Sequence, residues 1–389
     1  MGLAATQSFK HLHRYVNRAL APIQPGARRD GVTCTLFGVT PGKASELNSE
    51  HRSEAGVAYR TGLGSMIHGS IEDALQSTSV SENAGAVQLI LTSPPFPLNR
   101  KKKYGNKDGQ AYIDWLADTC SLLGDLLTDD GSLVIEIGNA WEPGKPVMST
   151  LALRALLEVV ERSGFQLCQQ FVCHNPARLP SPAQWVNIER IRVKDAFTHV
   201  WWMSRTDRPK ANNRNILTEY SDAMRKLFTS GKYNAGSRPS EFHIGEQSFF
   251  TNNGGAIPPN ALTQDHLSNF LTAANTSSND DYLRYCREHE IEIHPARMHP
   301  GLVEFFIRFL TDEGDWVMDP FAGSNTTGAT AEALGRHWLC VEQQSDYVEG
   351  SKGRFDNLSV LEAPPSGSRF SIVEASMADF EQVSRQNGK

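Results

Sequence analysis

The stretch that decides the fold is WVMDPFAGSNTT, residues 316–327. Its apolar start, Trp316–Met318, predicts a short strand, and Thr326–Leu334 predicts a helix that ends at Gly335. A second apolar run, Trp338–Val341, predicts the next strand. Strand, loop, helix and strand in this order are typical of an α/β sheet, in which ligands bind just past the carboxyl ends of the strands. The loop between the first strand and the helix is therefore a predicted ligand site.

The same alternation recurs earlier in the chain. Further strands are predicted at Val87–Thr92, Ser132–Ile137, Leu167–Cys173 and Thr198–Met203. Helical spacing of apolar residues predicts helices over 113–127, 153–160 and 302–310. Between about 205 and 292 the pattern fails, and this stretch predicts a small subdomain of irregular structure. We divide the chain into an N-terminal arm (1–55), a first half of the core (56–205), the irregular region (206–292), a second half (293–360) and a C-terminal tail (361–389).

Composition excludes several classes of protein. The 389 residues have a mean hydropathy of -0.40, and no apolar run approaches the roughly 18 residues of a membrane helix. A net charge of -6 argues against a protein whose whole surface attracts phosphate, although one basic face suffices to bind nucleic acid. The six cysteines form no C-x-x-C pair, so we expect neither a metal site nor disulfides, and a cytoplasmic location.

The loop at 319–327 favours a nucleoside-like ligand. Gly323 permits close approach of the backbone, and Asn325 tolerates a left-handed conformation. Glu342 lies 19 positions after Gly323, where an acid can accept hydrogen bonds from ribose hydroxyls. The loop is not G-x-G-x-x-G, which disfavours a dinucleotide. S-adenosylmethionine fits, with Glu342 on the ribose and Asp319 on the methionine ammonium. An ordinary turn with a surface glutamate is the alternative.

A second motif, Thr92-Ser93-Pro94-Pro95-Phe96, follows a predicted strand. Its prolines fix the backbone and leave carbonyls without a competing local N–H. If a flipped cytosine enters here, the Ser93 hydroxyl and the Pro94 carbonyl can each accept one N–H of its amino group. The nitrogen lone pair is then aimed at a sulfonium methyl, and Phe96 can stack on the extruded base. The alternative is a rigid turn with Phe96 in the core.

Basic residues surround these motifs. From 178 to 214 the chain has eight basic and three acidic residues, a local excess that is the expected footprint of nucleic acid. His294 and Arg297 precede the helix predicted at 302–310 and can wall the methionine end of the pocket. The residues predicted to contact DNA are Arg100, Lys101, Lys102, Lys103, Arg192 and Lys194.

Together, these motifs resemble those of the amino-methyltransferases that modify exocyclic nitrogens in DNA. Residues 319–324 resemble their cofactor motif, and 92–96 resemble the catalytic motif of the N4-cytosine members, whereas N6-adenine members usually carry Asp or Asn before the prolines. The catalytic motif comes first, which is the beta arrangement of the family. The resemblance implies a Rossmann-like core with a mixed sheet, S-adenosylmethionine as methyl donor, double-stranded DNA as substrate, and 206–292 as the target-recognition region.

The resemblance also implies roles for individual residues. The catalytic motif comprises Ser93, Pro94, Pro95 and Phe96. The residues implied to bind the cofactor are Ser70, His294, Arg297, Asp319, Phe321, Ala322, Gly323, Asn325, Thr326 and Glu342. The sequence departs from the family at Ser70, because the family generally has an acid there that meets the adenine amino group. Glu72 or Asp73 can compensate. Asn325 replaces a commoner glycine.

We therefore expect a site-specific DNA methyltransferase that modifies the N4 amine of a flipped cytosine, in a bacterial or phage setting. A cognate restriction endonuclease is a possible partner, and the protein is expected to be a monomer or a homodimer. An N6-adenine methyltransferase and a DNA-binding homologue with a dead cofactor pocket are the alternatives, and RNA is not excluded as a substrate.

Overall fold

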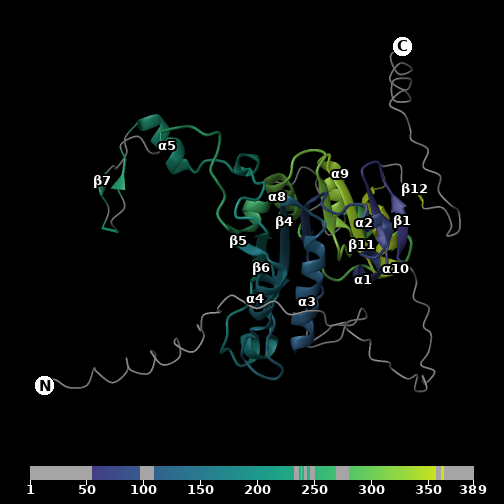
Figure 1. Ribbon diagram of the computed structural model, residues 1–389. Coiled ribbons are helices and arrows are strands. Elements are labelled where there is room, and N and C mark those ends of the chain that lie inside the picture. Colours follow the sequence, from purple (N-terminus) through teal and green to yellow (C-terminus); the bar gives the residue numbers. More distant parts are fainter. Residues whose placement is uncertain are drawn as a thin grey trace, which may run out of the picture. The chain divides into compact units, whose positions relative to one another are not determined.

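The fold is known from a computed structural model that describes residues 55–96, 109–231, 236–237, 239–240, 243–245, 250–268, 280–355 and 361–362. The N-terminal arm up to residue 54, the basic run at 100–103 and the tail beyond 362 lie outside the described residues. The α/β expectation is confirmed, because a mixed sheet is covered by helices on both faces (Figure 1).

Ten strands form the main sheet in the order β12-β1-β2-β11-β10-β3-β4-β6-β5-β9. The five from β2 to β4 run parallel to one another, whereas β1 is antiparallel to β2 and β6 is antiparallel to both β4 and β5. The strands are β1 (Gly56–Arg60), β2 (Gly64–His68), β3 (Val87–Thr92), β4 (Leu127–Gly138), β5 (Gln166–His174), β6 (Phe197–Ser204), β9 (Ala261–Leu262), β10 (Trp316–Asp319), β11 (His337–Glu342) and β12 (Leu361–Glu362). A separate pair contains β7 (Gly236–Ser237) and β8 (His243–Ile244).

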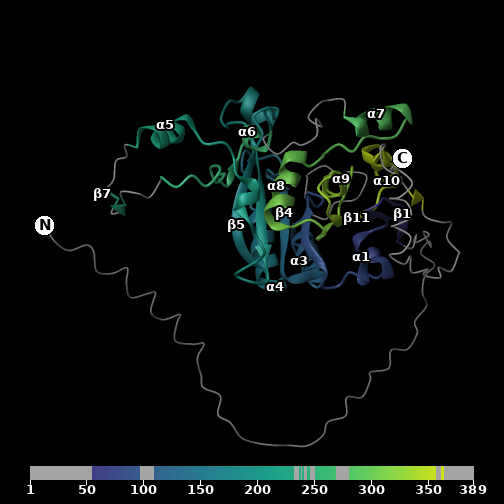
Figure 2. The ribbon, with the colours of Figure 1, turned by 90° about the horizontal axis from the view of Figure 1, so that it is seen from above.

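The strands have apolar residues on both faces, which explains why helices cover both faces of the sheet. In β11, Leu339 and Val341 join one core cluster, and Trp338 and Cys340 join the other. This period of two is that of a strand buried on both sides. The helices α3 (Gly109–Gly124) and α4 (Leu151–Ser163) fill the first cluster, together with α1 (Ile71–Ala74) and α2 (Thr78–Ser81). The second cluster is filled by α8 (Pro300–Leu310) and α9 (Thr326–Ala333), on the opposite face in Figure 2.

The connections reverse direction between β10 and β3. From β10 the chain passes through α9 to β11, whereas from β3 it passes through α3 to β4 on the other side. A reversal of this kind leaves a crevice at the carboxyl ends of the two strands, where open α/β sheets bind their ligands. The two motifs of the sequence follow these two strands, so the topology brings them to one place.

The predicted strands and helices are confirmed, with differences at their ends. The helix expected over 113–127 ends at Gly124 and Leu127 begins β4, while Gly164 ends α4 in the left-handed conformation. Strands β1 and β2 were not expected, because glycine and polar residues interrupt their short apolar runs.

The region 206–292 is less irregular than expected. It contains α5 (Asp222–Ser230), α6 (Gln264–Ser268) and α7 (Asp281–Glu288). Strand β9 joins the main sheet beside β5, and α7 packs against the 3-10 turn Lys352–Phe355, which follows α10 (Ser345–Ser351). Parts of this region therefore belong to the core. The sequence pattern did not indicate this, because the helices and strands here are short and lie between polar loops.

Candidate functional site

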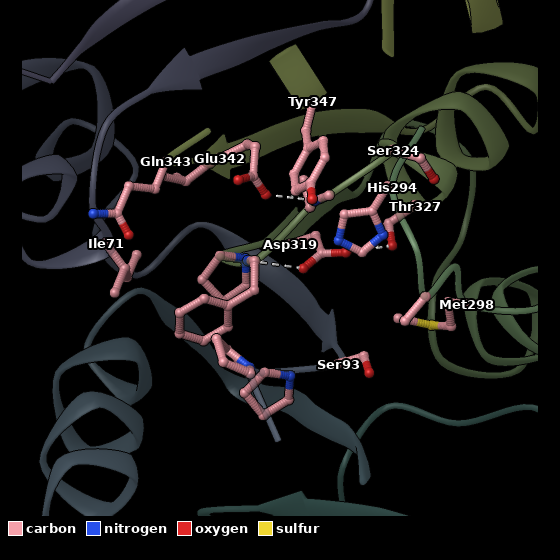
Figure 3. Close-up of a pocket in the computed structure, with 18 of the residues that line it drawn as sticks. Ile71, Ser93, His294, Met298, Asp319, Ser324, Thr327, Glu342, Gln343 and Tyr347 are labelled. Carbon is pink, nitrogen blue, oxygen red and sulfur yellow. Dashed lines mark hydrogen bonds between the residues drawn. The ribbon is translucent and has the colours of Figure 1, made fainter. Parts of the chain in front are cut away.

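A cavity of about 290 Å³ lies at the carboxyl ends of the central strands. Its walls come from segments that follow β2, β3, β10 and β11, and from residues 294–298 before α8. Figure 3 shows Ile71 and Gln343 at one end, His294 and Met298 at the other, and Glu342 and Asp319 between them. A pocket at this topological position, lined by both apolar and polar groups, has the character of a small-molecule site.

The catalytic and cofactor motifs meet in this cavity. Ser93, Pro94, Pro95 and Phe96 line it together with residues 319–324. A direct bond joins the two motifs, because the Thr92 hydroxyl donates to Asp319 Oδ1 at 2.7 Å. Phe96 also packs against the first core cluster, as the alternative of a turn with Phe96 in the core expects, and its stacking on a base stays a prediction. Phe96 and Gly323 line the same cavity.

Asp319 is buried at the centre of the site with only 2% of its surface exposed. Besides the bond from Thr92, Oδ1 accepts the Phe321 N–H at 3.0 Å, and Oδ2 accepts the Thr327 hydroxyl at 2.7 Å. Burial raises the pKa of the Asp319 carboxyl above its ordinary value, and the three donors partly counteract this. A carboxylate offers about four lone-pair positions, so one remains for a ligand.

Glu342 accepts two backbone bonds, from Gly323 N–H to Oε2 and from Gln344 N–H to Oε1, each at 2.8 Å. Two of its roughly four acceptor positions are left, which suits the two hydroxyls of a ribose. Burial raises the pKa of this carboxyl as well. Gly323 has a φ of 53°, and a Cβ there would lie 3.0 Å from the His294 ring. Only glycine lets the loop approach His294 this closely.

Asn325 does not line the cavity. It is fully buried with a φ of 54°, its Oδ1 accepts the Gly328 N–H at 3.0 Å, and its Nδ2 donates to the Tyr59 hydroxyl at 3.0 Å. The cofactor contact expected of Asn325 is thus replaced by a cap of α9. Its ability to adopt the left-handed conformation is used as the sequence predicted. The remaining residues predicted to bind the cofactor do line the cavity.

Ser70 lines the cavity, but its hydroxyl is engaged in capping α1. It donates to Asp73 Oδ2 at 2.8 Å and accepts the Asp73 N–H at 3.1 Å. Glu72 also lines the cavity, and its Oε1 accepts the indole N–H of Trp115 at 2.8 Å. Of the two acids expected to compensate for Ser70, Glu72 is therefore the one at the cavity wall.

Sequence reasoning missed the aromatic end of the site. Trp115 lies with its ring centroid 5.5 Å from that of Phe321 and 5.8 Å from that of Tyr112, and all three line the cavity. The helical period of α3 predicts buried positions but not which of them reach a pocket. The Tyr112 hydroxyl is buried and has no hydrogen-bond partner among the residues that the structure describes.

The sequence also predicted only some of the residues at the other end of the cavity, beside His294. Arg297 lines the cavity and donates to Asp280 Oδ2 at 2.8 Å, and the His294 ring packs edge-on against Tyr347 with centroids 4.5 Å apart. Arg354 donates through Nη2 to the Ser324 hydroxyl at 3.1 Å and also approaches Asp280. Asp280 and Arg354 stand far from either motif in sequence, so no local signal marks them.

The predicted DNA-contacting residues that can be assessed are exposed. Arg192 Nε donates to the Pro146 carbonyl at 3.0 Å, and Lys194 Nζ donates to the Pro176 carbonyl at 2.6 Å. Both cations therefore have intramolecular partners. Within the described residues there is no cluster of three or more metal-ligating side chains, and no described helix is long and apolar enough to cross a membrane.

Comparisons with known proteins agree with this geometry. The chain is 41% identical over 307 residues to the type II methyltransferase M.PvuII of Proteus hauseri, covering 78% of this chain and 87% of that protein. A solved structure named PvuII DNA methyltransferase (cytosine-N4-specific) matches with a TM-score of 0.59 and 35% identity over 80% of this chain and 90% of that chain. The DNA adenine methyltransferase YhdJ of Escherichia coli (strain K12) is 40% identical over 74 residues, 19% of this chain and 25% of that protein.

A family model described as DNA methylase, for N6 and N4 methyltransferases, matches residues 87–353. This span includes both motifs, all the strands from β3 to β11 and most of the cavity wall. The match covers more than half of the chain, so the protein belongs to the N6/N4 DNA methylase family.

Proposed function

We propose that the protein transfers a methyl group from S-adenosylmethionine to the N4 amine of a flipped cytosine in double-stranded DNA. The observation that carries this is the bond between Thr92 and Asp319, which holds the Ser93-Pro94-Pro95-Phe96 turn against the 319–324 loop within one cavity. The similarity to M.PvuII over most of both chains supports cytosine N4 as the acceptor.

The donor fits the groups that line the cavity. Its adenine suits the aromatic end formed by Ile71, Trp115 and Phe321. Its ribose hydroxyls suit the free acceptor positions of Glu342, and its ammonium suits the last acceptor position of Asp319. When bound, the donor supplies an electrophilic methyl on a sulfonium sulfur. The cavity fits a nucleoside better than a dinucleotide, because no glycine-rich pyrophosphate loop follows β10.

The residues after β3 prepare the acceptor. Cytosine N4 is a poor nucleophile while its lone pair is delocalised into the ring. The Ser93 hydroxyl and the Pro94 carbonyl accept its two N–H bonds and hold the nitrogen closer to tetrahedral geometry. The new N–C bond forms as the methyl–sulfur bond breaks, and the nitrogen becomes cationic. Hydrogen bonds to these two oxygens strengthen as that charge develops, which lowers the barrier. The methylated nitrogen then loses one proton to solvent water and becomes neutral.

The same proposed function assigns roles to the larger regions of the chain. We propose residues 206–292 as the target-recognition region and 56–205 and 293–360 as the two halves of the core. Arg100–Lys103 would contact phosphates near the flipped base. M.PvuII is named a type II methyltransferase, and we propose that this protein likewise acts in the cytoplasm beside an endonuclease of matching specificity. Protection of DNA from that endonuclease after incubation with the methyltransferase tests this pairing.

Nucleoside analysis tests the activity directly. Bacterial genomic DNA is incubated with the protein and S-adenosylmethionine, digested to nucleosides and examined by mass spectrometry. We expect N4-methyldeoxycytidine, which should be absent when the donor is omitted. N6-methyldeoxyadenosine in its place would assign the protein to the adenine-modifying branch. Donor binding without any methylated nucleoside would instead contradict catalysis.

A further inference from the structure

Large apolar side chains are exposed on two loops of the protein. Val193 is 86% exposed, Leu179 80% and Ile188 69%. These lie in the segment 178–197, which follows β5 and includes the first residue of β6, and others lie in 141–148 between β4 and α4. The exposed apolar residues of the two segments are Val147, Met148, Leu179, Ile188, Ile191, Val193 and Phe197. We call these segments the two-loop surface. Apolar groups gathered in this way usually mark an interaction site.

The two loops form a single, braced surface. The Trp141 and Trp185 rings pack with centroids 5.5 Å apart. Arg192 Nε donates to the Pro146 carbonyl at 3.0 Å, which ties the middle of one loop to the other. At the base of the loops, Asn139 Nδ2 donates to Asp195 Oδ1 at 2.8 Å. These contacts therefore hold the two loops together, so that their exposed apolar side chains belong to one surface.

The charge of the two-loop surface is opposite to that of the whole chain. It contains five cations, Lys145, Arg178, Arg190, Arg192 and Lys194. It contains three acids, of which Asp195 is bound by Asn139 and Glu189 accepts a bond from Gln184 Nε2 at 2.9 Å. A surface that is both cationic and apolar complements a partner with dense negative charge and flat apolar rings. Nucleic acid has both properties.

The sheet places the roots of this surface beside the candidate cytosine site. Strand β4 is the neighbour of β3, and Gly138 at its end lies against the Phe96 ring, 3.3 Å from where a Cβ would stand. Thr198 at the start of β6 pairs with Gly138 and with Cys173 near the end of β5. With strands about 4.8 Å apart, the loop roots lie within about 15 Å of the end of β3. The two-loop surface is therefore near the cavity that Ser93 lines.

We propose that the two-loop surface binds duplex DNA next to the flipped cytosine, with its cations on phosphates and with Leu179 and Val193 against bases exposed when the duplex opens. This inference rests on the proposed function. It extends the DNA contacts predicted for Arg192 and Lys194 to the apolar side chains of the same surface, outside 206–292. Apolar side chains that press between base steps stabilise opened or kinked DNA. Contacts with bases explain why apolar side chains are exposed here, whereas phosphate binding would need only the cations.

Binding measurements on variants test the apolar contribution. The probe is a labelled duplex, once fully paired and once with a short internal cytosine mismatch, and binding is followed by fluorescence anisotropy over a series of salt concentrations. The double variant Leu179→Ser/Val193→Ser should bind the mismatched duplex about tenfold more weakly, because it loses the apolar contacts with the exposed bases. Its salt dependence should stay unchanged. Leu157→Ser, at a 62% exposed position of α4, is the matched control.

The cationic contribution has a different signature. The double variant Lys145→Gln/Arg190→Gln should flatten the slope of log affinity against log salt by up to about 0.9 for each lost phosphate contact. Arg284→Gln, at an exposed position of α7, is the control for charge. Thermal unfolding of every variant should match that of the unmodified protein, because the substituted side chains are exposed.

Wild-type affinity in the apolar double variant would overturn the inference. So would a change from dimer to monomer in sedimentation with unaltered DNA binding, since the surface would then be a protein interface. Failure of the proposed function looks different, because duplex binding would persist and depend on these residues while no methylated nucleoside formed.

Discussion

Thr92 and Asp319 stand 227 positions apart, and the 2.7 Å bond between them is the contact that makes one site from two motifs. It also limits what Asp319 can do, because the carboxylate accepts three bonds from the protein before any ligand arrives. Each donor fixes the orientation of the carboxylate, so that one acceptor position faces the cavity. Preorganisation of this kind lowers the cost of binding a charged ligand.

Thr92→Val removes the hydroxyl with little change of shape. We expect the free energy of unfolding to fall by about 1–3 kcal/mol, because a buried carboxylate loses a donor. Donor affinity should fall as well, since the two motifs lose their direct link. Denaturant unfolding and calorimetry measure the two effects. Thr330→Val, which removes a hydroxyl bonded only within α9, is the control and should leave donor affinity unchanged.

Ser93→Ala should lower turnover about 100-fold while leaving the affinity for S-adenosylmethionine unchanged. The expected size is that of removing one preorganised group from a charge-developing transition state. Steady-state kinetics and calorimetry separate turnover from donor binding. Ser81→Ala, at an exposed position, is the control. A parallel loss of donor affinity would place Ser93 on the donor and not on the cytosine.

Because the pKa of Asp319 is raised, we expect both the stability of the fold and donor binding to depend on pH. Because the folded state holds this proton more tightly than the unfolded state, stability decreases as pH rises from the ordinary carboxyl value through the raised folded value. Binding of the donor ammonium should change in the opposite sense and strengthen as the carboxyl ionises. Asp319→Asn should weaken donor binding by about tenfold and flatten its pH profile in the acid range. An unchanged profile in calorimetry would refute the assignment of Asp319 to the ammonium.

Among the elements, the turn that follows α10 supports the cofactor loop from behind. Arg354 lies in this 3-10 turn with only 5% of its side chain exposed, and it donates to both the carbonyl and the hydroxyl of Ser324. It also stacks over the Tyr282 ring of α7 at 5.0 Å. One side chain thus connects α7, the loop after β10 and the turn after α10.

Arg354→Met should therefore cost about 3–5 kcal/mol of stability, because it leaves buried acceptors without their cation. Arg354→Lys should rescue it only in part, since an ammonium cannot reproduce the planar fork of the guanidinium. Denaturant unfolding measures both variants, and Arg284→Met on the exposed part of α7 is the control. Full rescue by lysine would show that charge alone matters at this position.

At the scale of the whole molecule, the sheet depends on residues from both ends of the described chain. Strand β10 lies between β3 and β11, so the strand of the cofactor loop is inserted next to a strand more than 200 residues earlier. The two halves of the core share both hydrophobic clusters. A ligand in the crevice between β10 and β3 touches both halves, and it should stabilise them as one unit.

S-adenosylmethionine at 100 times its dissociation constant should raise the free energy of unfolding by about 2.7 kcal/mol. Thermal unfolding in its presence should shift upward as a single transition, because the halves share one core. NAD at the same concentration is the control and should produce no shift, since the loop after β10 lacks the glycines that admit a pyrophosphate. A comparable shift with NAD would contradict the nucleoside reading of the cavity.

Local sequence patterns predicted the central strands of the sheet well and the strands near its edges poorly. Strand β3 was predicted to its exact ends, because six consecutive buried residues stop at a pair of prolines. The strands β1 and β2 were missed because glycine and polar residues interrupt their apolar runs, and β9 was missed because it has only two residues. The predicted cofactor residues line the cavity except Asn325, whose side chain faces the protein interior. Residue type and spacing indicate a loop conformation, but they do not indicate which side of the loop faces a ligand.

The amino-acid sequence by itself determined the α/β class, both motifs and their order, because short-range periodicity, prolines and glycines act within a few residues. Only the tertiary structure decided that Thr92 bonds Asp319, that Trp115 and Tyr112 close the aromatic end, and that Arg354 supports Ser324. Contacts between distant segments depend on strand order and on the reversal between β10 and β3. No local pattern encodes either of them, because each results from the simultaneous burial of both faces of the sheet.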